Sequence, residues 1–411
     1  MAAHVPSITR RLFGDSAGDF LDALLAQETF AGFVLVGALL VGVLWATLGA
    51  ASYEAFVTAP VHLPSVPQTM VHNVETLVTN ALMVLFFGAI GLEIARERAV
   101  GALKDPVTAV APVVAALGGM AMAAVTYLVV LLIEGNHGAM AGWGIPMATD
   151  VAFTLGALSL LGSRVSKELR VFLLTLAVAD DVASVLVLGL TSHNGTPFHP
   201  VKSSLLILGA LACIALVFVA RKVCPRAWVF IASALLLWWI LAQLGIEPTL
   251  AGVIVGVLVP MAADPQVVGL KLERVVAPLS TFVVLPLFAI AVGGVDLAAK
   301  PWVHHGGFLL ALLLARSLGK IVGIVGGVAL VVRFGIGALP SSTSWRQLSG
   351  AALLCGIGFT VPLLFATNTF SNSPGLIAAT KVGLLLASVL CGVLGLSILA
   401  LTKSPRLKEA E

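Results

Sequence analysis

The chain has 411 residues, of which 59% are hydrophobic and only 10% are charged, and its mean hydropathy is +1.07. In soluble domains about a quarter of the residues are charged, so this composition excludes an ordinary soluble protein and indicates one that crosses a membrane several times. The net charge of +3 is too small to indicate a nucleic-acid partner.

Twelve apolar runs follow one another along the chain, and most are long enough to cross a bilayer as a helix. We therefore predict an all-α integral membrane protein with twelve transmembrane helices in one domain over residues 28–402. A cytoplasmic surface segment (1–27), expected to form a short amphipathic helix, precedes this domain, and a cytoplasmic tail (403–411) follows it. The predicted spans are 28–50, 77–95, 107–133, 144–162, 168–190, 201–220, 227–244, 248–262, 276–295, 306–332, 347–370 and 375–402.

The distribution of basic residues predicts how these spans are oriented. If the N-terminus is inside, nearly all Lys and Arg residues outside the spans lie in inner segments, and the outer segments hold only Lys202, Lys300 and Lys381. Basic residues accumulate on the cytoplasmic side of membrane proteins, so we expect both termini to be cytoplasmic.

The fourth predicted span begins with glycine and proline and then carries a polar pair, Thr149 and Asp150. Non-helical backbone is tolerated at membrane depth only where protein buries it or where it lines a cavity. This span is therefore a candidate broken helix. In a purely structural interpretation, Asp150 only complements the positive ends of two half-helices.

The eleventh predicted span is interrupted in a similar way by Gly356, Gly358 and Pro362. Glycine and proline weaken a helix, although glycine can also serve only close helix packing. Interruptions at corresponding positions in spans three to five and ten to twelve are typical of inverted repeats with a binding site between them. We therefore predict inverted repeats in which the fourth and eleventh helices are broken.

Asp180 and Asp181 lie midway along the fifth predicted span, roughly 16–18 Å from its start. A charge at the middle of a bilayer costs at least about 2.5–3.5 kcal/mol, so two adjacent carboxylates there indicate a functional site. The alternative is a hydrogen-bonded motif that only packs helices. Neighbouring residues on a helix point about 100° apart, so the two carboxylates can have different roles.

Lys320 lies at a similar depth in the tenth predicted span, roughly 20 Å from its start. Gly319, Gly323 and Gly327 form a ridge of small residues that would bring Lys320 close to a neighbouring helix. Arg316 lies one turn earlier. It can repel Lys320, pair with another group, or extend toward the membrane surface.

These groups suit the exchange of a cation for protons. Carboxyl and lysine groups that are removed from water can change protonation near neutral pH, and oxygen ligands favour hard cations. A site that holds either protons or a small cation, but not both, couples the two. One of the two aspartates is expected to pair with Lys320, and Asp181 is the candidate. Lys320 can also complement the negative ends of half-helices.

Other features narrow the class of transporter. Glu93, Arg96 and Glu97 close the second predicted span, where they can line an inner entrance that attracts cations or form a solvated helix end. The chain has no phosphate-binding P-loop, which argues against an ATP-driven pump. The alternative is a sodium-coupled symporter of an organic anion on a related inverted-repeat fold. An anion site would need unpaired positive groups or free helix N-termini.

Several sequence motifs resemble those of the NhaA-type sodium/proton antiporters. They keep the order of that family and cover most of the chain. The matching motifs are Asn80-Ala-Leu-Met, Gly91-Leu-Glu93, Ile145-Pro-Met-Ala-Thr149-Asp150, Ala179-Asp180-Asp181, Thr249-Leu-Ala-Gly-Val, Gly319-Lys320 and Leu354-Cys-Gly-Ile-Gly-Phe-Thr360.

The resemblance implies a fold of twelve helices in which the broken fourth and eleventh helices cross. It implies electrogenic exchange of sodium or lithium for more than one proton, which exports sodium and serves pH and sodium homeostasis. It also implies a bacterial inner membrane protein that forms a homodimer. Its partners would be the transported Na+ or Li+, protons and the lipid bilayer, and no cofactor is expected.

The same resemblance assigns roles to the residues described above. It implies that Asp180 and Asp181 form the cation and proton site and that Lys320 is an essential membrane lysine. Thr149 and Asp150 match the Thr-Asp pair of the family's broken helix.

Acidic residues outside this centre also match the family. Glu93 and Glu273 match positions that the family associates with a cytoplasmic funnel and with the response to pH. The chain departs from the family at other positions. Glu247 stands where many members carry a histidine, and we predict that it joins Glu93 and Glu273 in the funnel and the response to pH. Ala277 replaces another histidine, and Arg316 is additional.

Overall fold

The computed structural model describes residues 15–62, 66, 71–161, 165–191, 200–223, 225–262, 264, 266–340 and 343–402. The predicted tail (403–411) and residues 1–14 of the predicted surface segment lie outside the described residues. Residues 15–27 of that segment belong to a helix that continues to Leu48.

Helices make up nearly all of the described ranges, in which no strand occurs apart from an isolated bridge between Pro60 and Asn73. The prediction of an all-helical protein is confirmed. The α-helices are α2 (Asp15–Leu48), α3 (Ala50–Val57), α4 (Val74–Leu77), α5 (Met83–Ala99), α6 (Pro106–Ile133), α7 (Val151–Ser159), α8 (Lys167–Thr191), α9 (Pro200–Val223), α10 (Ala227–Leu244), α11 (Leu250–Leu258), α12 (Val268–Leu279), α13 (Leu285–Ala291), α14 (Gly306–Leu314), α15 (Lys320–Arg333), α16 (Trp345–Leu354), α17 (Thr360–Thr369) and α18 (Pro374–Leu401).

Short stretches of other helix types join these α-helices. Three are π-helical turns, which the sequence patterns did not predict and which are frequent at functional sites. One of them directly precedes Lys320. The π turns are η1 (Val78–Leu82), η5 (Ser280–Val284) and η6 (Ala315–Gly319), and the 3-10 turns are η2 (Ala102–Lys104) and η3 (His137–Gly144).

Within the described ranges, nine helical stretches are long and apolar enough to cross a membrane. They coincide with nine of the predicted spans. The other three predicted spans, 144–162, 248–262 and 347–370, contain the shorter helices α7, α11, and α16 with α17. An apolar run therefore predicted where helices form, but it did not tell whether each helix is continuous.

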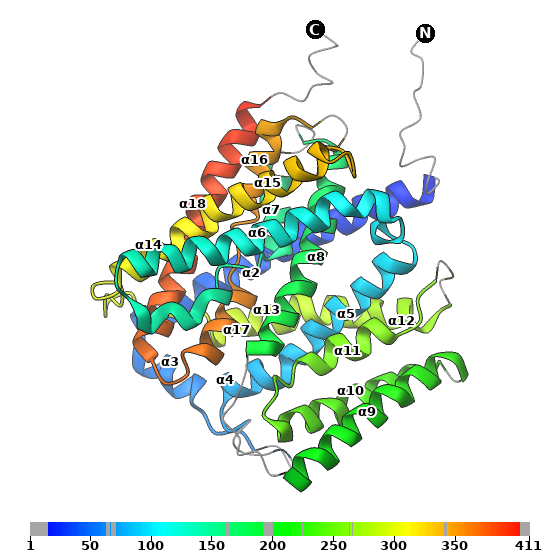
Figure 1. Cartoon of the computed structure of the whole chain (residues 1–411). Coiled ribbons are helices and arrows are strands. Elements are labelled where there is room, and N and C mark those ends of the chain that lie inside the picture. The colour runs from blue at the N-terminus through cyan, green and yellow to red at the C-terminus, as the bar shows by residue number, and fades with distance from the viewer. Residues whose placement is uncertain are drawn as a thin grey trace, which may run out of the picture.

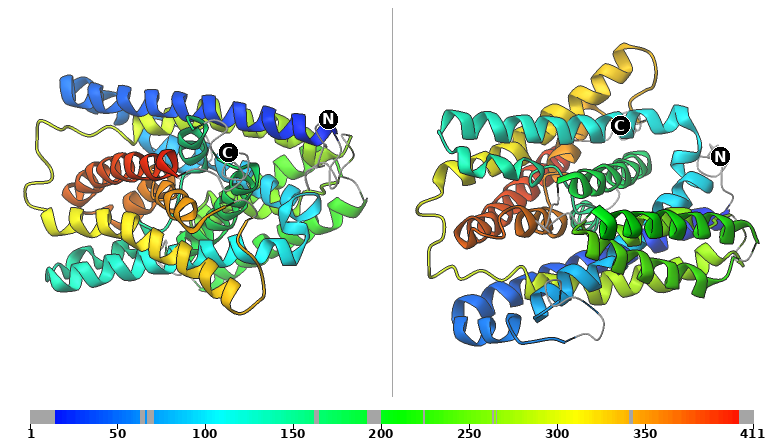
Figure 2. Two further views of the ribbon diagram at one scale, coloured as in Figure 1. Left: turned by 90° about the horizontal axis from the view of Figure 1, so that it is seen from above. Right: turned by 60° about the horizontal axis from the view of Figure 1, so that its bottom comes forward.

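Most buried apolar side chains fall into two large clusters and one peripheral cluster. The first includes residues of α2, α5, α13 and α14, the second includes residues of α6, α8, α15 and α16, and the peripheral one joins α9 and α10 to α11. The helices α2 and α6 lie on opposite sides of the bundle, and the hairpin of α9 and α10 lies at its edge (Figures 1 and 2).

The boundary between the two large clusters passes through the interrupted helices. Ala148 belongs to the first cluster and Leu155 to the second. Across the other interruption, Leu354 belongs to the second cluster and Phe359 to the first. Both interruptions therefore lie inside the protein, between its two main apolar cores.

Glycines bring two pairs of helices into backbone contact. On α15, which packs against α6, Gly323 faces the carbonyl of Gly118. On α11, which packs against α5, Gly252 faces the carbonyl of Val84. A Cβ atom at either glycine would collide with that carbonyl oxygen. The predicted ridge of small residues thus holds the helix of Lys320 against a neighbour.

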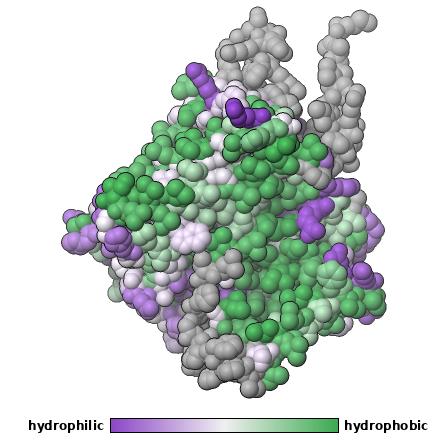
Figure 3. Space-filling model, viewed as in Figure 1, coloured by the Kyte–Doolittle hydropathy of each residue, from purple (hydrophilic) through white to green (hydrophobic). Residues whose placement is uncertain are grey.

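Large apolar side chains also cover much of the outside of the bundle. In the view of Figure 3 they form a broad hydrophobic surface, with hydrophilic residues mainly at its edges. A surface of this kind requires lipid rather than water around the protein. Together with the nine apolar helical stretches, it identifies a multi-pass membrane protein.

Candidate functional site

The first helix interruption lies between η3 and α7, in the fourth predicted span. Pro146 has no N–H to continue a helix, and α7 begins only at Val151. The two polar residues of the motif, Thr149 and Asp150, fall in the non-helical segment and are buried. The helix boundaries therefore leave a non-helical segment at the point where the sequence predicted a break.

The second interruption lies between α16, which ends at Leu354, and α17, which begins at Thr360. Gly356 and Gly358 lie in this segment, where space is short. A Cβ atom on Gly356 would collide with the carbonyl oxygen of Arg316, and one on Gly358 would collide with the Arg316 guanidinium. Glycine is needed here because another part of the protein approaches the backbone closely.

The two interruptions bond directly to each other. The Asp150 N–H donates to the Ile357 carbonyl at 3.2 Å, and the Thr149 hydroxyl donates to the Cys355 carbonyl at 2.7 Å. These bonds satisfy backbone groups that a continuous helix would have satisfied itself. The two non-helical segments thus replace the missing helical hydrogen bonds for each other.

The Asp150 carboxylate lies at the N-terminus of α17. It accepts hydrogen bonds from the N–H of Phe359, from the N–H of Thr360 at 2.9 Å and from the Thr360 hydroxyl. The N-terminus of a helix carries partial positive charge, which a carboxylate complements. Asp150 therefore stabilises the second interruption, as the structural interpretation of this residue expected.

Lys320 and Asp180 form a buried ion pair. The Lys320 Nζ lies 3.3 Å and 3.4 Å from the two carboxylate oxygens of Asp180 and donates to the Thr149 hydroxyl at 3.0 Å. The expectation that Lys320 pairs with Asp181 is wrong. The rotation of α8 in the bundle turns Asp180, rather than its neighbour, toward α15.

Asp181 is also mostly buried, at 6% exposure, and no hydrogen bond of its carboxylate occurs among the described residues. One turn further along α8, the buried Ser184 hydroxyl likewise has no partner within those ranges. Buried polar atoms of proteins are nearly always satisfied, so the unsatisfied Ser184 hydroxyl, one turn from the two aspartates, is a candidate ligand for a bound ion.

Arg316 is fully buried in η6 and bonds to backbone carbonyls instead of carboxylates. Its Nε donates to the Gly356 carbonyl at 2.9 Å, and its terminal nitrogens donate to the Ala148 carbonyl at 3.1 Å and the Ile145 carbonyl at 3.5 Å. Of the three expectations for Arg316, pairing with another group is the one that the geometry shows. No sequence pattern indicated which group that would be.

A second charged cluster lies at the end of α5. Arg96 contacts Glu273 of α12 at 2.9 Å, Glu97 at 3.5 Å and Glu93 at 3.7 Å. The side chains of Arg96, Glu93 and Glu273 are partly exposed, with 12–27% of their surface accessible to solvent. The structure thus brings together Glu93 and Glu273, which lie far apart in the sequence.

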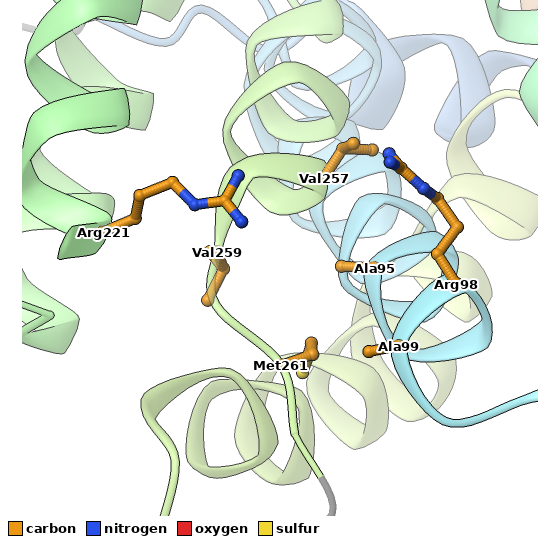
Figure 4. Close-up of a pocket in the computed structure, with 7 residues that line it drawn as sticks. All are labelled: Ala95, Arg98, Ala99, Arg221, Val257, Val259 and Met261. Atoms are coloured by element: carbon orange, nitrogen blue, oxygen red, sulfur yellow. The ribbon is translucent and has the colours of Figure 1, made fainter. Parts of the chain in front are cut away.

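A hollow of about 190 Å³ opens beside the same end of α5. Figure 4 shows the guanidinium groups of Arg98 and Arg221 at this hollow, with Val257, Val259 and Met261 among its other lining residues. Its charged lining is wholly basic, so it does not suit a cation. The acidic cluster around Arg96 is the better candidate for a cation entrance.

Glu247 lies apart from both clusters, between α10 and α11. It is buried and accepts hydrogen bonds from the Thr249 hydroxyl at 2.8 Å and from the Asn368 side-chain amide at 2.7 Å. The bond to Asn368 links this turn to the end of α17. Burial raises the pKa of the Glu247 carboxyl above its ordinary value, and the two hydrogen bonds oppose that rise.

Sequence reasoning missed some residues that the geometry brings into the centre. The Thr360 hydroxyl, the partner of Asp150, was visible only as part of a motif. Ser184 gave no signal beyond its spacing from the two aspartates. A polar residue three or four positions from a buried carboxylate on a helix is the pattern that could have indicated it.

Buried carboxylates, a buried lysine and two facing helix interruptions, in a protein that crosses the membrane several times, place the chain among ion-coupled membrane transporters. The sequence matches the family described as Na+/H+ antiporter 1 over residues 22–399. The chain belongs to this family.

Its similar proteins include several named Na+/H+ antiporter NhaA. The one from Acidovorax sp. (strain JS42) is 36% identical over 393 residues, which are 93% of this chain and 92% of the relative. The one from Gluconobacter oxydans (strain 621H) is 37% identical over 396 residues, 96% of this chain and 93% of the relative. The one from Rhodospirillum rubrum is 35% identical over 395 residues, 93% of this chain and 97% of the relative. These relatives give no support to the organic-anion symporter.

Proposed function

We propose that the protein is a secondary antiporter that exports Na+ or Li+ in exchange for protons. One observation carries this proposal: the ion pair of Asp180 and Lys320 is fully buried beside two helix interruptions, with the Asp181 carboxylate next to it. Membership of the Na+/H+ antiporter 1 family supports the same function.

The exchange follows from competition for carboxylate oxygens. A cation that binds Asp180 must displace the ammonium group of Lys320, and a proton bound to Asp181 must leave before this carboxylate can coordinate the cation. The hydroxyls of Thr149 and Ser184 add oxygen ligands, which favour a hard cation such as Na+ or Li+. Return of protons on the other side releases the cation. Exchange of more than one proton per cation makes the cycle electrogenic.

The helix pattern supports twelve membrane crossings. The nine long stretches account for nine, and α7, α11, and α16 with α17 would provide the rest. In this arrangement the fourth and eleventh crossings are the interrupted ones, and they cross each other where their non-helical segments bond. Inverted repeats of three helices around each interruption fit a site between the two repeats.

The acidic cluster at the end of α5 fits the role of a cytoplasmic entrance. Glu93 and Glu273 would raise the local concentration of cations at this end of α5. A change in the charge of this cluster would alter the supply of cations, which makes it a candidate for a response to pH. Glu247 has no part in this cluster and is proposed only as a second pH-responsive group.

The distribution of basic residues supports an orientation with both termini in the cytoplasm. In Figure 1 the start of α2 and the end of α18 lie toward the same upper side of the bundle, which agrees with that orientation. We place the protein in a bacterial inner membrane, as a homodimer surrounded by lipid. It needs no cofactor, because the transported ions are its only substrates.

Everted membrane vesicles with a pH-sensitive dye provide the test. Respiration acidifies the vesicles, and addition of Na+, Li+ or K+ at several pH values reports any exchange. The variants Asp180→Asn and Asp181→Asn are compared with Asp264→Asn, which changes an exposed acidic residue. We expect Na+ or Li+ to collapse the gradient in the wild type and in Asp264→Asn, and neither centre variant to exceed about 1% of that rate.

The outcomes separate the alternatives. A wild type that responds to no cation contradicts the antiporter. Sodium uptake that depends on an added organic anion would instead restore the symporter. Full activity of Asp180→Asn and Asp181→Asn would show that the buried centre is not the exchange site, even if the protein is an antiporter.

A further inference from the structure

Each helix interruption leaves helix ends of both signs inside the protein. The ends of η3 and α16 present backbone carbonyls with partial negative charge, and the starts of α7 and α17 present N–H groups with partial positive charge. Both interruptions lie between the two main apolar cores. Side chains that complement both signs would stabilise these groups.

Asp150 complements one positive end, as its three hydrogen bonds at the start of α17 show. For the negative ends, the sequence left Lys320 as a candidate. The structure places Lys320 elsewhere, on Asp180 and Thr149. The side chain that reaches the carbonyls is Arg316, which the family resemblance did not provide.

Arg316 bonds to both interruptions although it belongs to neither. Its guanidinium donates to the Gly356 carbonyl of the second interruption and to the Ala148 and Ile145 carbonyls of the first. A guanidinium carries five N–H donors in a rigid fork and does not lose its charge in proteins. It can thus connect several carbonyls at once, which a lysine ammonium on a flexible chain does less well.

Arg316 and Lys320 reach different partners although they lie only four residues apart. Arg316 belongs to the π-helical turn Ala315–Gly319, and Lys320 directly follows this turn. The Arg316 guanidinium bonds to the carbonyls of the interruptions, and the Lys320 ammonium bonds to the Asp180 carboxylate.

We propose that Arg316 is a positioning residue for the exchange site. It is the fixed countercharge that holds the carbonyl ends of both helix interruptions and leaves Lys320 free to compete with the transported cation for Asp180. This inference rests on the proposed antiporter function. It gives the two basic side chains of the centre separate roles. Arg316 keeps its partners throughout the cycle, whereas Lys320 changes its partner when the cation binds.

The charge of Arg316 also has a direct effect on the site. Its permanent positive charge, held at the Ala148 carbonyl two residues before Asp150, opposes the binding of a further cation. If the Arg316 charge were removed, the Lys320 ammonium would be attracted to the backbone carbonyls that Arg316 had occupied. Asp180 would then bind Na+ more tightly. The same loss of fixed geometry would slow the cycle, because small displacements at a reacting centre reduce rates strongly.

The test compares Arg316→Gln and Arg316→Lys with the wild type in proteoliposomes. We expect Arg316→Gln to have a several-fold lower KM for Na+ and a maximal rate lower by about 100-fold. Arg316→Lys keeps the charge but not the fork, so its KM should return near the wild-type value while its rate recovers only in part. Ser317→Ala is the matched control, because among the described residues the Ser317 hydroxyl bonds to the preceding turn, at the Leu313 carbonyl 2.6 Å away.

A second measurement uses the tight space at Gly358. The change Gly358→Ala displaces the Arg316 guanidinium, so it should reproduce the kinetics of Arg316→Gln. The double variant should transport at nearly the same rate as Arg316→Gln alone. The methyl group added at position 358 then meets a shorter glutamine side chain instead of the guanidinium. Sodium-induced thermal stabilisation of the purified variants gives a readout of binding that does not depend on transport.

The results separate this inference from the proposed function. A wild type without Na+-dependent exchange overturns both. An active wild type with Arg316→Gln at unchanged KM and unchanged maximal rate overturns only the role of Arg316. If Arg316→Gln does not fold, Arg316→Lys decides: a wild-type maximal rate in that variant contradicts the need for the fork.

Discussion

The charged cluster in the middle of the protein and the one at the end of α5 use the same kinds of side chains in different surroundings. In the middle, Asp180 and Lys320 are about 1% exposed, and backbone groups of two helix interruptions complete the network. At the end of α5, Arg96 and Glu273 keep 12% and 17% of their exposure and pair mainly through side chains.

The difference shows that surroundings, more than contact distance, decide what a charge pair contributes. The Arg96–Glu273 contact of 2.9 Å is shorter than the 3.3 Å between Lys320 and Asp180. Nevertheless, removal of one partner from a buried pair costs about 3–5 kcal/mol, whereas partly exposed pairs contribute about 0–1 kcal/mol. Loss of one partner is therefore expected to cost more at the buried pair, although its contact is the longer one.

The largest effect is expected from Lys320→Met. This change leaves the Asp180 charge buried without its partner, so the free energy of unfolding should fall by about 3–5 kcal/mol in an SDS titration. The double variant Asp180→Asn with Lys320→Met removes both charges and should recover most of this loss, although not transport. Lys271→Met, at an exposed position, is the control. A double variant as unstable as Lys320→Met would contradict the pairing.

A smaller effect is expected where a carboxylate bonds only to neutral groups. Asp150→Ala leaves the start of α17 without its acceptor and should cost about 2–3 kcal/mol. Thr360→Val removes only the hydroxyl that donates to the same carboxylate and should cost about 1 kcal/mol. The measurement is the loss of unfolding free energy in each variant. Equal losses in Asp150→Ala and Thr360→Val would contradict the role of Asp150 as the cap of α17.

Glu247 tests the intermediate case of a buried acid whose hydrogen bonds, in the part of the chain that the structure describes, are to neutral groups only. Because burial raises its pKa in the folded protein, the folded state binds this proton more tightly than the unfolded chain does. Stability should therefore fall as pH rises above about 4.3, the unfolded value, until the folded pKa is passed. Glu247→Gln should remove this dependence, so its stability relative to the wild type should increase with pH. If the difference in unfolding free energy between Glu247→Gln and the wild type stays constant from about pH 4 to about pH 8, Glu247 is not titrating in this range.

The smallest effect is expected from Glu273→Gln at the end of α5. Its loss should change stability by about 0–1 kcal/mol, and transport should continue. The KM for Na+ should rise a few-fold at low ionic strength and return toward the wild-type value in high salt, because salt screens partly exposed charges. A KM that is insensitive to salt would argue against an electrostatic entrance.

The sequence located the centre because charge in an apolar run is conspicuous. Asp180, Asp181, Lys320 and the Thr149–Asp150 pair were all found in this way, and glycine and proline indicated both interruptions. The helices themselves followed from apolar runs, so the all-helical fold and most helix limits were predictable.

The partners within the centre were not predictable, because they depend on how helices rotate and pack. Lys320 and Asp180 are 140 residues apart, and only the rotation of α8 decides which aspartate faces the lysine. The π turn that contains Arg316 and precedes Lys320 has no simple sequence signal. The bond between Glu247 and Asn368 likewise joins residues 121 positions apart.

The bond from Phe359 to Asp150 spans 209 residues, which has a consequence for the biogenesis of the protein. At about 5–20 residues per second, the ribosome needs roughly 10–40 s after Asp150 to supply its partner. Until then the first interruption has no second interruption to bond. The centre must therefore close late, after the other helices are inserted, and a chain released before Phe359 would keep an unsatisfied carboxylate inside the membrane.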